Sequence, residues 1–293
     1  METPKVAFIG AGNMGAPMAR RVKAAGFEVQ VCDANPATRA AFAAEGVAVT
    51  ALARDCASAD VVIVLVATDA QILDVVCGPD GVGPAIAPGH RPIVAIMCTT
   101  LPRTVQAVAE GLASTAARVL DAPISGGIVR AEEGTLTIMA GGEADDVEAV
   151  RPVFEAMGRR LFHCGPLGSA EVVKLVNNAV GIANMYVAAE AIDLAARHGV
   201  PFERLAPILE VSTGRNFLTA DADEGRRQYA AWARDPEAFR ALLNIVGKDL
   251  HLVRELAGAI GMPTPLVDRV SDHVDRSDDA TMRRWRRAGG LPD

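Results

Sequence analysis

The stretch Gly168–Arg197 reads GSAEVVKLVNNAVGIANMYVAAEAIDLAAR, and the rest of the chain is organised around it. Ser169 can cap the start of a helix there, and Gly199 with Pro201 can end it. The stretch predicts one helix of about seven or eight turns, roughly 40 Å long at about 1.5 Å per residue. Residues 175–189 carry no charge, so we expect most faces of this helix to be buried.

Two polar residues near the start of this helix share one of its faces. Lys174 and Asn178 are four residues apart, and side chains at that spacing stack on one side of a helix. Burial of a lysine amine is unfavourable unless the amine has a partner or a task. Lys174 is therefore a candidate catalytic residue. The alternative is a lysine that extends from the helix toward water.

The composition limits the kinds of partner that the chain can bind. It has 293 residues, half of them hydrophobic, which is enough for two domains with cores of their own. The formal net charge of −7 disfavours nucleic acid or an anionic membrane as a partner. Five cysteines without a Cys-x-x-Cys motif fit reduced thiols, and five histidines show no metal-ligand spacing. We expect no metal site.

The sequence also favours a soluble protein. Residues 1–5 lead directly into an apolar strand pattern, which predicts that there is no signal peptide. The uncharged run 175–189 is shorter than about 20 residues and contains three asparagines, so it does not predict a membrane span. We therefore expect a cytoplasmic location and no membrane partner.

The first half of the chain alternates between strand and helix patterns. Apolar runs predict strands at residues 6–9, 28–32, 59–66, 93–97, 118–121 and 161–164. Helical patterns follow at residues 17–25, 37–44, 70–76, 103–112 and 145–157. Such alternation predicts an α/β domain with a Rossmann-type, doubly wound parallel sheet.

From residue 169 onward the sequence has no convincing strand pattern. After the long helix, further helices are predicted at residues 203–212, 221–233, 236–258 and 265–275. We therefore expect a Rossmann domain at residues 1–165 and an all-helical C-terminal domain at residues 166–293, with the long helix linking them.

A glycine motif follows the first predicted strand. In Gly10-x-Gly12-x-x-Gly15 the first glycine allows a tight turn and the second lets the backbone approach a pyrophosphate. The third glycine lets helix and strand pack closely, and N–H groups at the helix start can then bind phosphate. The motif predicts a dinucleotide site that also includes Asn13 and Met14.

An acidic residue ends the second predicted strand. Asp33 lies 18 residues beyond Gly15, where a carboxylate can accept both ribose hydroxyls of NAD and repel the 2′-phosphate of NADP. We therefore predict NAD as the cofactor and disfavour NADP. Arg39, one turn into the next helix, could reach a 2′-phosphate, but we favour its interpretation as an ordinary solvent-facing charge.

A second motif, DAPISGG, occupies residues 121–127. A serine hydroxyl and two glycines at the end of a strand offer donors that can bind a small anion. From these residues alone, a turn without a function is an equal alternative.

Four motifs together resemble the β-hydroxyacid dehydrogenase family, which includes 3-hydroxyisobutyrate dehydrogenase. They are GAGNMGAPMA at residues 10–19, DAPISGG at 121–127, Lys174 with Asn177 and Asn178, and KDL at 248–250. They occur in the family's order and extend over essentially the whole chain. The resemblance is specific for the family and not for a substrate.

The resemblance implies roles for residues in both predicted domains. It makes Lys174 the catalytic lysine and Asn178 the residue that helps to hold the reacting oxygen. Implied ligands of substrate or cofactor are Ser125, Gly126 and Gly127 at the substrate carboxylate, Lys248 at substrate and nicotinamide, and Thr99 beside the nicotinamide ribose. Cys98 stands where the family has serine, and we interpret it as a small buried residue.

We therefore expect an NAD-dependent oxidoreductase of a short β-hydroxy acid, similar to 3-hydroxyisobutyrate, with Lys174 as general acid and base. Residues 1–165 would bind NAD. Residues 166–293 would bind substrate and form a homodimer or homotetramer through residues 169–260. The alternatives are an NAD(P)H-dependent reductase of tartronate, glyoxylate or succinic semialdehyde, and a dinucleotide-binding scaffold without catalysis.

Three arginine-containing segments keep two interpretations each. Arg130 and Arg215 could meet an acidic group of the substrate or could face solvent. The sequence RRWRR at residues 283–287 is interpreted as a basic tail, either a subunit contact or a solvated end.

Overall fold

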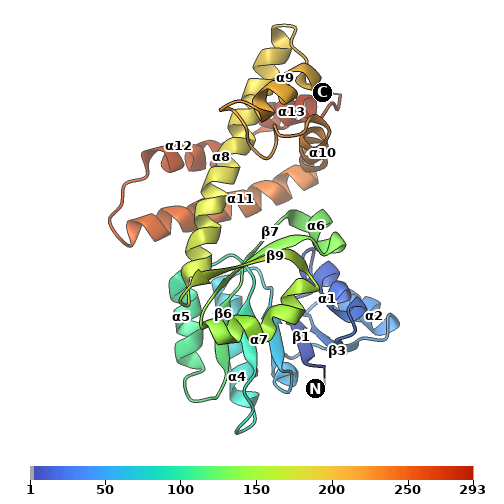
Figure 1. The fold of residues 1–293 in the computed structure, drawn as a ribbon, viewed down its shortest axis with the longest axis vertical. Helices are drawn as coiled ribbons and strands as arrows, with labels where there is room; N and C mark the ends of the chain where they lie inside the picture. The colour runs from blue at the N-terminus through green and yellow to red at the C-terminus, as the bar shows by residue number, and fades with distance from the viewer. Residues whose placement is uncertain (1–2, 293) are drawn as a thin grey trace. The chain divides into compact units, whose positions relative to one another are not determined.

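The computed structural model describes residues 3–292 and separates into two compact units (Figure 1). Unit 1 is Met1–Lys174 and unit 2 is Leu175–Asp293. The division falls inside helix α8 (Ser169–Arg197), whereas the sequence suggests a boundary after residue 165. The long helix itself is confirmed, with the length that its sequence predicts.

Unit 1 is built on a sheet of nine strands within the described residues, in the order β3-β2-β1-β4-β5-β6-β8-β7 with β9 beside β8. From β3 to β6 every neighbouring pair is parallel, which is the order of a doubly wound Rossmann sheet. The predicted fold class is therefore confirmed. The strands are β1 (Lys5–Ile9), β2 (Glu28–Cys32), β3 (Ala48–Thr50), β4 (Val61–Val64), β5 (Ile93–Ile96), β6 (Arg118–Asp121), β7 (Ile124–Ser125), β8 (Leu136–Gly141) and β9 (Gly158–Gly165).

Helices cover both faces of this sheet. Val6 and Phe8 of β1 belong to one apolar cluster with residues of α1 and α7, and Ala7 and Ile9 belong to a second cluster with residues of α3 and α5. Both faces are apolar, which is why the strands read as continuous apolar runs in the sequence. The helices are α1 (Gly15–Ala24), α2 (Pro36–Ala44), η1 (Ala53–Cys56), α3 (Asp69–Cys77), α4 (Val82–Ala85), α5 (Pro102–Gly111), α6 (Gly127–Glu133) and α7 (Ala144–Glu155).

One end of the sheet departs from the all-parallel prediction. Strand β8 is antiparallel to β6 and β7, and β9 is parallel to β8. Residues 123–142, for which the sequence predicts no helix or strand, fold as β7, α6 and β8. Strand β7 and helix α6 escaped prediction because they have two and seven residues, too few for a clear period.

Every regular element among the described residues of unit 2 is a helix, as predicted. After the C-terminal part of α8 come α9 (Phe202–Glu210), α10 (Ala222–Trp232), α11 (Pro236–Gly258), α12 (Pro265–Asp275) and α13 (Asp279–Ala288). Asp221, Asp235 and Asp278 cap α10, α11 and α13 with their side chains. These caps fix where the three helices begin.

The helix α13 corrects the interpretation of residues 283–287 as a tail. Trp285 is fully buried, and its ring lies 5.2 Å from the ring of Tyr186 and 5.8 Å from that of Tyr229. Thr281, Trp285 and Ala288 are the buried residues of α13, a helical spacing that the surrounding arginines obscure. The segment is therefore part of the core of unit 2.

The arginines of α13 are paired inside unit 2. Arg284 forms an ion pair with Glu190 of α8 at 3.1 Å, and Arg287 forms one with Asp193 of α8, also at 3.1 Å. The segment is consequently not a solvated end.

One face of α8 is exposed, contrary to the expectation that most faces are buried. Val176, Val180, Val187 and Leu194 are each more than half exposed. Their spacing of 4, 7 and 7 residues places them along one side of the helix, because about 3.6 residues make a turn. We call this row the α8 stripe.

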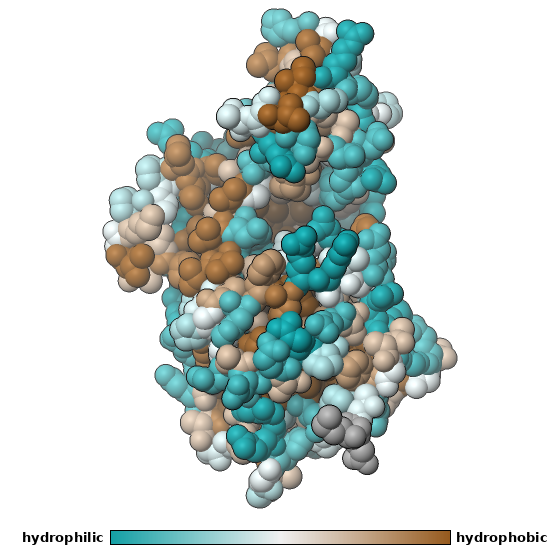
Figure 2. Space-filling view, in the orientation of Figure 1, coloured by the Kyte–Doolittle hydropathy of each residue, from teal (hydrophilic) through white to brown (hydrophobic). Residues whose placement is uncertain are grey.

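A second group of exposed apolar side chains lies where α11 leads into α12. Ile260, Met262 and Leu266 are more than half exposed, and Figure 2 shows hydrophobic residues gathered in this part of unit 2. Among residues 3–292, α8 is the one helix long and apolar enough to cross a membrane, by length and composition alone. Core helices of soluble proteins meet the same criterion, so the absence of a membrane partner stays a prediction.

Candidate active site

The glycine loop joins β1 to α1, and its three glycines meet different surroundings. Gly10 has φ of 93°, and a Cβ there would lie 2.4 Å from the carbonyl oxygen of Leu65. A Cβ on Gly15 would lie 2.2 Å from the carbonyl oxygen of Gly10. Gly12 differs, because a Cβ there would meet nothing within 4 Å. The protein's own packing therefore requires Gly10 and Gly15, whereas Gly12 leaves open space for a ligand to approach the backbone.

The start of α1 offers the donors that a pyrophosphate needs. Met14 stands at the N-cap, and its side chain makes no capping hydrogen bond. Asn13, beside it, is exposed. Because the first N–H groups of a helix have no partner inside the helix, this end of α1 can bind an anion. The geometry fits the dinucleotide site that the glycine motif predicts.

The carboxylate of Asp33 is hydrogen-bonded to the glycine loop. Its Oδ2 accepts a hydrogen bond from the N–H of Ala11 at 2.7 Å, and its Oδ1 accepts one from the N–H of Asn35 at 2.8 Å. Each carboxylate oxygen has a second lone pair, so Asp33 can still accept ribose hydroxyls. The ribose role of Asp33 stays a prediction.

Arg39 is not the solvent-facing charge that the sequence suggests. Its Nη1 donates to the carbonyl oxygens of Asp33 at 2.7 Å and Ala34 at 2.9 Å. The guanidinium is therefore held beside the acidic end of β2. This position bears on the choice between NAD and NADP, because an arginine there can accommodate a 2′-phosphate.

A buried carboxylate fixes the start of α8. Asp121, the last residue of β6, is fully buried, and its two oxygens accept hydrogen bonds from the N–H groups of Gly168 at 2.7 Å and Glu171 at 2.9 Å. Burial raises the pKa of Asp121, and these backbone hydrogen bonds oppose that shift. A Cβ on Gly141 would lie 2.4 Å from Oδ1, so glycine at that position makes room for the carboxylate.

Lys174 follows on the next turn of α8. The residue is only 8% exposed, which does not fit a side chain that extends into water. One turn earlier, Glu171 is fully buried, and its Oε2 accepts the N–H of Thr100 at 3.1 Å. Thr100 in turn donates its hydroxyl to Asp69 at 2.6 Å. Within unit 1, the helix turn before Lys174 is thus linked to the segment that carries Thr99.

Neither Asp121 nor Glu171 was predicted to act at the site. From the sequence alone, Asp121 is only the first residue of the DAPISGG motif, and Glu171 is only one residue of the long predicted helix. Their partners lie 47 to 71 residues away along the chain, so no local pattern could reveal these hydrogen bonds.

Ser125 is the last residue of β7, Gly126 is the N-cap of α6, and Gly127 is the first residue of α6. Gly126 has φ of 140° and Gly127 has φ of 71°, and nothing lies within 4 Å of where a Cβ on Gly127 would be. A Cβ on Gly126 would lie 2.8 Å from Cδ of Arg130, so the aliphatic part of that exposed arginine covers Gly126. The predicted binding of a carboxylate at Ser125 is not tested by this arrangement.

Unit 2 brings two predicted site residues together through a third. Asn178 of α8 donates from Nδ2 to Oδ2 of Asp249 at 2.7 Å, and Nζ of Lys248 lies 3.1 Å from Oδ1 of the same carboxylate. Asp249 itself is buried. From the sequence alone, Asp249 is only the residue after Lys248 in the KDL motif.

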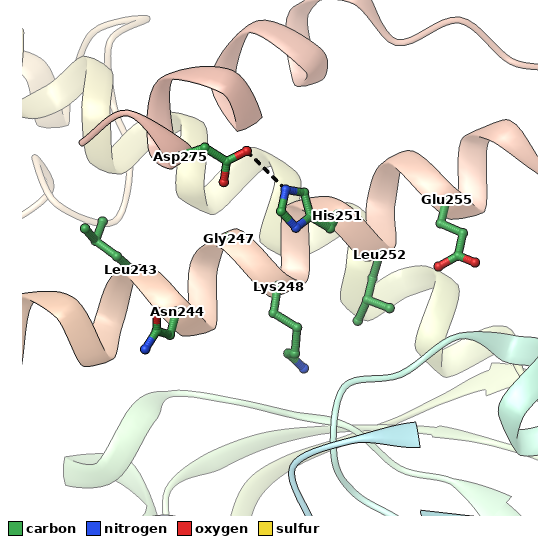
Figure 3. A pocket seen from close by; sticks show the side chains of 8 residues that line it. All are labelled: Leu243, Asn244, Gly247, Lys248, His251, Leu252, Glu255 and Asp275. Atoms are coloured by element: carbon green, nitrogen blue, oxygen red, sulfur yellow. Dashed lines mark hydrogen bonds and ion pairs between the residues drawn. The ribbon is translucent and has the colours of Figure 1, made fainter. Parts of the chain in front are cut away.

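Lys248 also lines an open pocket of about 410 Å³ along α11. Figure 3 shows Asn244, Lys248 and Leu252 projecting from one side of α11, as their spacing of four residues requires. His251 turns instead toward Asp275, and Nε2 of the imidazole lies 3.1 Å from Oδ2 of that carboxylate.

Residues 5–165 match the family of the NAD binding domain of 6-phosphogluconate dehydrogenase. Residues 168–285 match the family described as NAD-binding of NADP-dependent 3-hydroxyisobutyrate dehydrogenase. The chain belongs to the β-hydroxyacid dehydrogenase family. Together the two matches extend over most of the chain, in agreement with the four motifs.

Individual members of this family are similar to the chain over nearly its whole length. An NAD-dependent L-serine dehydrogenase of Pseudomonas aeruginosa is 36% identical, with 89% of this chain and 88% of that protein covered. A 3-hydroxyisobutyrate dehydrogenase of the same organism is 33% identical, with the same coverage of 89% and 88%. The solved structure of Mycobacterium tuberculosis 3-hydroxyisobutyrate dehydrogenase with L-serine is 29% identical, with a TM-score of 0.78 and 94% of each chain covered.

The remaining predictions for this β-hydroxyacid dehydrogenase concern Cys98, Arg215 and a metal site. Cys98 is half-buried, whereas a buried residue was expected, and no disulfide joins the five cysteines. Arg215 forms an ion pair with Glu210 at 3.0 Å, and its side chain is 63% exposed. Within residues 3–292 no group of three or more His, Cys, Asp or Glu side chains could hold a metal ion, and the predicted absence of a metal stays a prediction.

Proposed function

We propose that the protein is an NAD-dependent oxidoreductase of a short β-hydroxy acid, with Lys174 as general acid and base. The observation that carries this proposal is the burial of Lys174 on α8, one turn after the backbone N–H groups that Asp121 binds. A lysine amine can accept and donate a proton, so a lysine held in a fixed position can act as general acid and base.

The glycine loop is the part of the chain that would hold the dinucleotide. The open space at Gly12 and the uncapped start of α1 suit a pyrophosphate, and Asp33 suits the adenosine ribose. NAD bound there would supply the hydride acceptor for the substrate carbon that bears the hydroxyl.

The residues of the chain then have separate tasks in the proposed reaction. Lys174 accepts the proton of the substrate hydroxyl in oxidation and returns it in reduction. Asn178, one helical turn later, donates a hydrogen bond to the same oxygen. Ser125 and the two glycines after it anchor the substrate carboxylate, which keeps the reacting carbon in place.

The similar enzymes support a small substrate. L-serine and 3-hydroxyisobutyrate, named for the relatives at 36% and 33% identity, both carry a primary hydroxyl on the carbon next to the one that bears the carboxylate. We propose this hydroxymethyl acid as the substrate class. A semialdehyde reductase using NADPH is the second candidate, and the position of Arg39 beside Asp33 favours it.

A turnover assay tests the proposal directly. L-serine, 3-hydroxyisobutyrate and glycerate would each be offered with NAD or NADP, and the reduced cofactor followed by its absorbance. We expect turnover with at least one hydroxymethyl acid and NAD. Dinucleotide binding without turnover in either direction would instead identify a scaffold.

Replacement of the proposed base is the sharper test. Lys174→Ala should lower kcat by about 10²–10⁴-fold, the usual contribution of one positioned acid–base group. Lys174→Arg should not restore it, since a guanidinium stays protonated. Lys23→Ala on the exposed face of α1 is the matched control and should keep kcat. A folded Lys174→Ala enzyme within about threefold of wild type would show that the base lies elsewhere.

Cofactor choice is tested at the end of β2. Asp33→Ala should lower the preference for NAD over NADP by about 10- to 100-fold, because hydrogen bonds to a charged acceptor contribute roughly 1.5–3 kcal/mol. The ratio of kcat/KM for the two cofactors is the measurement, since disturbance of the glycine loop affects both alike. Arg39→Ala should weaken NADP alone. A wild type that uses NADP better would contradict the assignment of NAD.

The α8 stripe is the basis for an oligomer proposal. A row of four exposed apolar side chains on one helix is unfavourable in water, so we place it in a homodimer or homotetramer of a cytoplasmic protein. Val180→Glu and Val187→Glu together should dissociate the assembly in light scattering. A wild type that is monomeric at micromolar concentration would contradict the proposal.

A further inference from the structure

Asp249 is a buried carboxylate at the junction of two helices in unit 2. It comes from α11, its side chain is 7% exposed, and its neighbours Val246, Leu250 and Val253 on α11 are buried and apolar. A carboxylate in such surroundings is unfavourable unless its oxygens are well satisfied.

Two predicted site residues contact it. Its Oδ2 accepts Nδ2 of Asn178 from α8 at 2.7 Å, and its Oδ1 lies 3.1 Å from Nζ of Lys248. One carboxylate is therefore in contact with both predicted site residues of unit 2.

The chemistry of the contact determines which way the amide of Asn178 is turned. The two ends of an amide are alike in shape, but a carboxylate can only accept hydrogen bonds, so the NH₂ end must face Asp249. The oxygen of Asn178 accepts Nδ2 of Asn177 at 3.1 Å, which agrees with that orientation. Nδ2 carries a second N–H, and its direction is fixed once the first is bound to Asp249.

We propose that Asp249 is a positioning residue that orients the amide of Asn178 toward the reacting oxygen of the substrate. This rests on the proposed function, in which Asn178 donates to that oxygen. Stability alone would not select the carboxylate, since well-packed apolar residues can replace buried ionic groups without loss.

The alternative is that Asp249 only joins α11 to α8. A double-mutant cycle separates the two roles, because residues that act through each other have effects that do not multiply. The variants are Asp249→Asn, Asn178→Ala and the double variant. Asp268→Asn is the matched control, since Asp268 joins α12 to α11 through an ion pair with Arg254 at 3.1 Å.

We expect Asp249→Asn to lower kcat by about 10- to 100-fold, which corresponds to one hydrogen bond to a charged group, with the NAD dissociation constant unchanged. In the Asn178→Ala background the same substitution should lower kcat by less than about threefold. Asp268→Asn should keep kcat within about twofold of wild type.

Each other outcome has a distinct meaning. Independent, multiplying losses from Asp249→Asn and Asn178→Ala would overturn the positioning role. A loss equal to that of Asp268→Asn would also overturn it. Absence of turnover in the wild type with every acid of the panel would overturn the proposed function itself. If Asp249→Asn does not fold, Asp249→Ser keeps a hydroxyl acceptor and replaces it in the same cycle.

Discussion

The two units hold their candidate site residues with different groups. In unit 1 the carboxylates nearest the site accept backbone N–H groups: Asp33 binds the N–H of Ala11, and Asp121 binds the N–H groups of Gly168 and Glu171. In unit 2 the corresponding carboxylate, Asp249, binds the side chains of Asn178 and Lys248.

This difference separates the path of the chain from the orientation of single side chains. A carboxylate that binds backbone N–H groups fixes where a segment runs, whatever side chains that segment carries. A carboxylate that binds an amide and an ammonium orients only those two groups. We therefore expect substitutions at the backbone-binding positions of unit 1 to reduce stability, and substitution of Asp249 to reduce turnover first.

Asp121→Asn should give the largest loss of stability. The substitution turns one acceptor into an NH₂ group that faces an N–H donor, either of Gly168 or of Glu171, so a buried donor loses its partner. We expect the free energy of unfolding to fall by about 3 kcal/mol in urea denaturation. Asp145→Asn, at an exposed position in the first turn of α7, should change it by less than about 0.5 kcal/mol. Equal stability of the two variants would contradict the stabilising role that we assign to the backbone-binding carboxylates of unit 1.

The glycine loop allows a matched test inside unit 1. Gly15→Ala would place a Cβ 2.2 Å from the carbonyl oxygen of Gly10 and should reduce the free energy of unfolding by about 2 kcal/mol. The Cβ of Gly12→Ala would meet nothing within 4 Å, so the free energy of unfolding of this variant should stay within about 0.5 kcal/mol of wild type.

The same pair should separate stability from binding. Gly12→Ala should raise the NAD dissociation constant by about tenfold or more, because its methyl group occupies space that a pyrophosphate would approach. Urea denaturation without cofactor and calorimetric titration with NAD are the two measurements. If Gly12→Ala destabilised the protein and bound NAD normally, Gly12 would be a packing residue like Gly15.

Much of unit 1 could be predicted from its sequence because the signals are local. The apolar runs of the strands, the three glycines and the caps and breakers around α8 all lie within a few residues of what they determine. The hydrogen bonds of Asp121 and Asp249 could not be predicted, since their partners lie 47 to 71 residues away.

The sequence of α13 suggests a basic tail, whereas the helix is part of the core of unit 2, and the difference has a physical reason. Four arginines surround Trp285 and suggest a solvated segment, yet the arginines extend from one side of the helix while the indole is fully buried. Long charged side chains can line the edge of a buried contact, so charge density alone does not report burial. The uncharged run of α8 shows the reverse, because Val180 and Val187 are apolar and exposed.

Of the substitutions expected to destabilise the protein, Tyr186→Phe should change the free energy of unfolding least at neutral pH, and its effect should depend most clearly on pH. The hydroxyl of Tyr186 shares a hydrogen bond with Ser277 at 2.8 Å, a contact between side chains of unit 2, and its loss should cost about 1 kcal/mol. Burial raises the pKa of Tyr186 to about 12 from the ordinary value of 10. The unfolded chain therefore ionises first, and the stability contributed by neutral Tyr186 is lost as the pH rises from about 10 through 12.

Near pH 11 this loss amounts to about 1.4 kcal/mol, since one pKa unit corresponds to that energy. The advantage of wild type over Tyr186→Phe should thus fall from about 1 kcal/mol at pH 7 to about −0.4 kcal/mol at pH 11, where wild type becomes the less stable of the two. Tyr229, the second tyrosine, also has a raised pKa because it is buried, but it is present in both proteins and cancels in the difference. Urea denaturation at the two pH values is the measurement. A difference that stays constant with pH would mean that Tyr186 ionises as it does in water, and that the side-chain contacts of unit 2 around it are open to solvent.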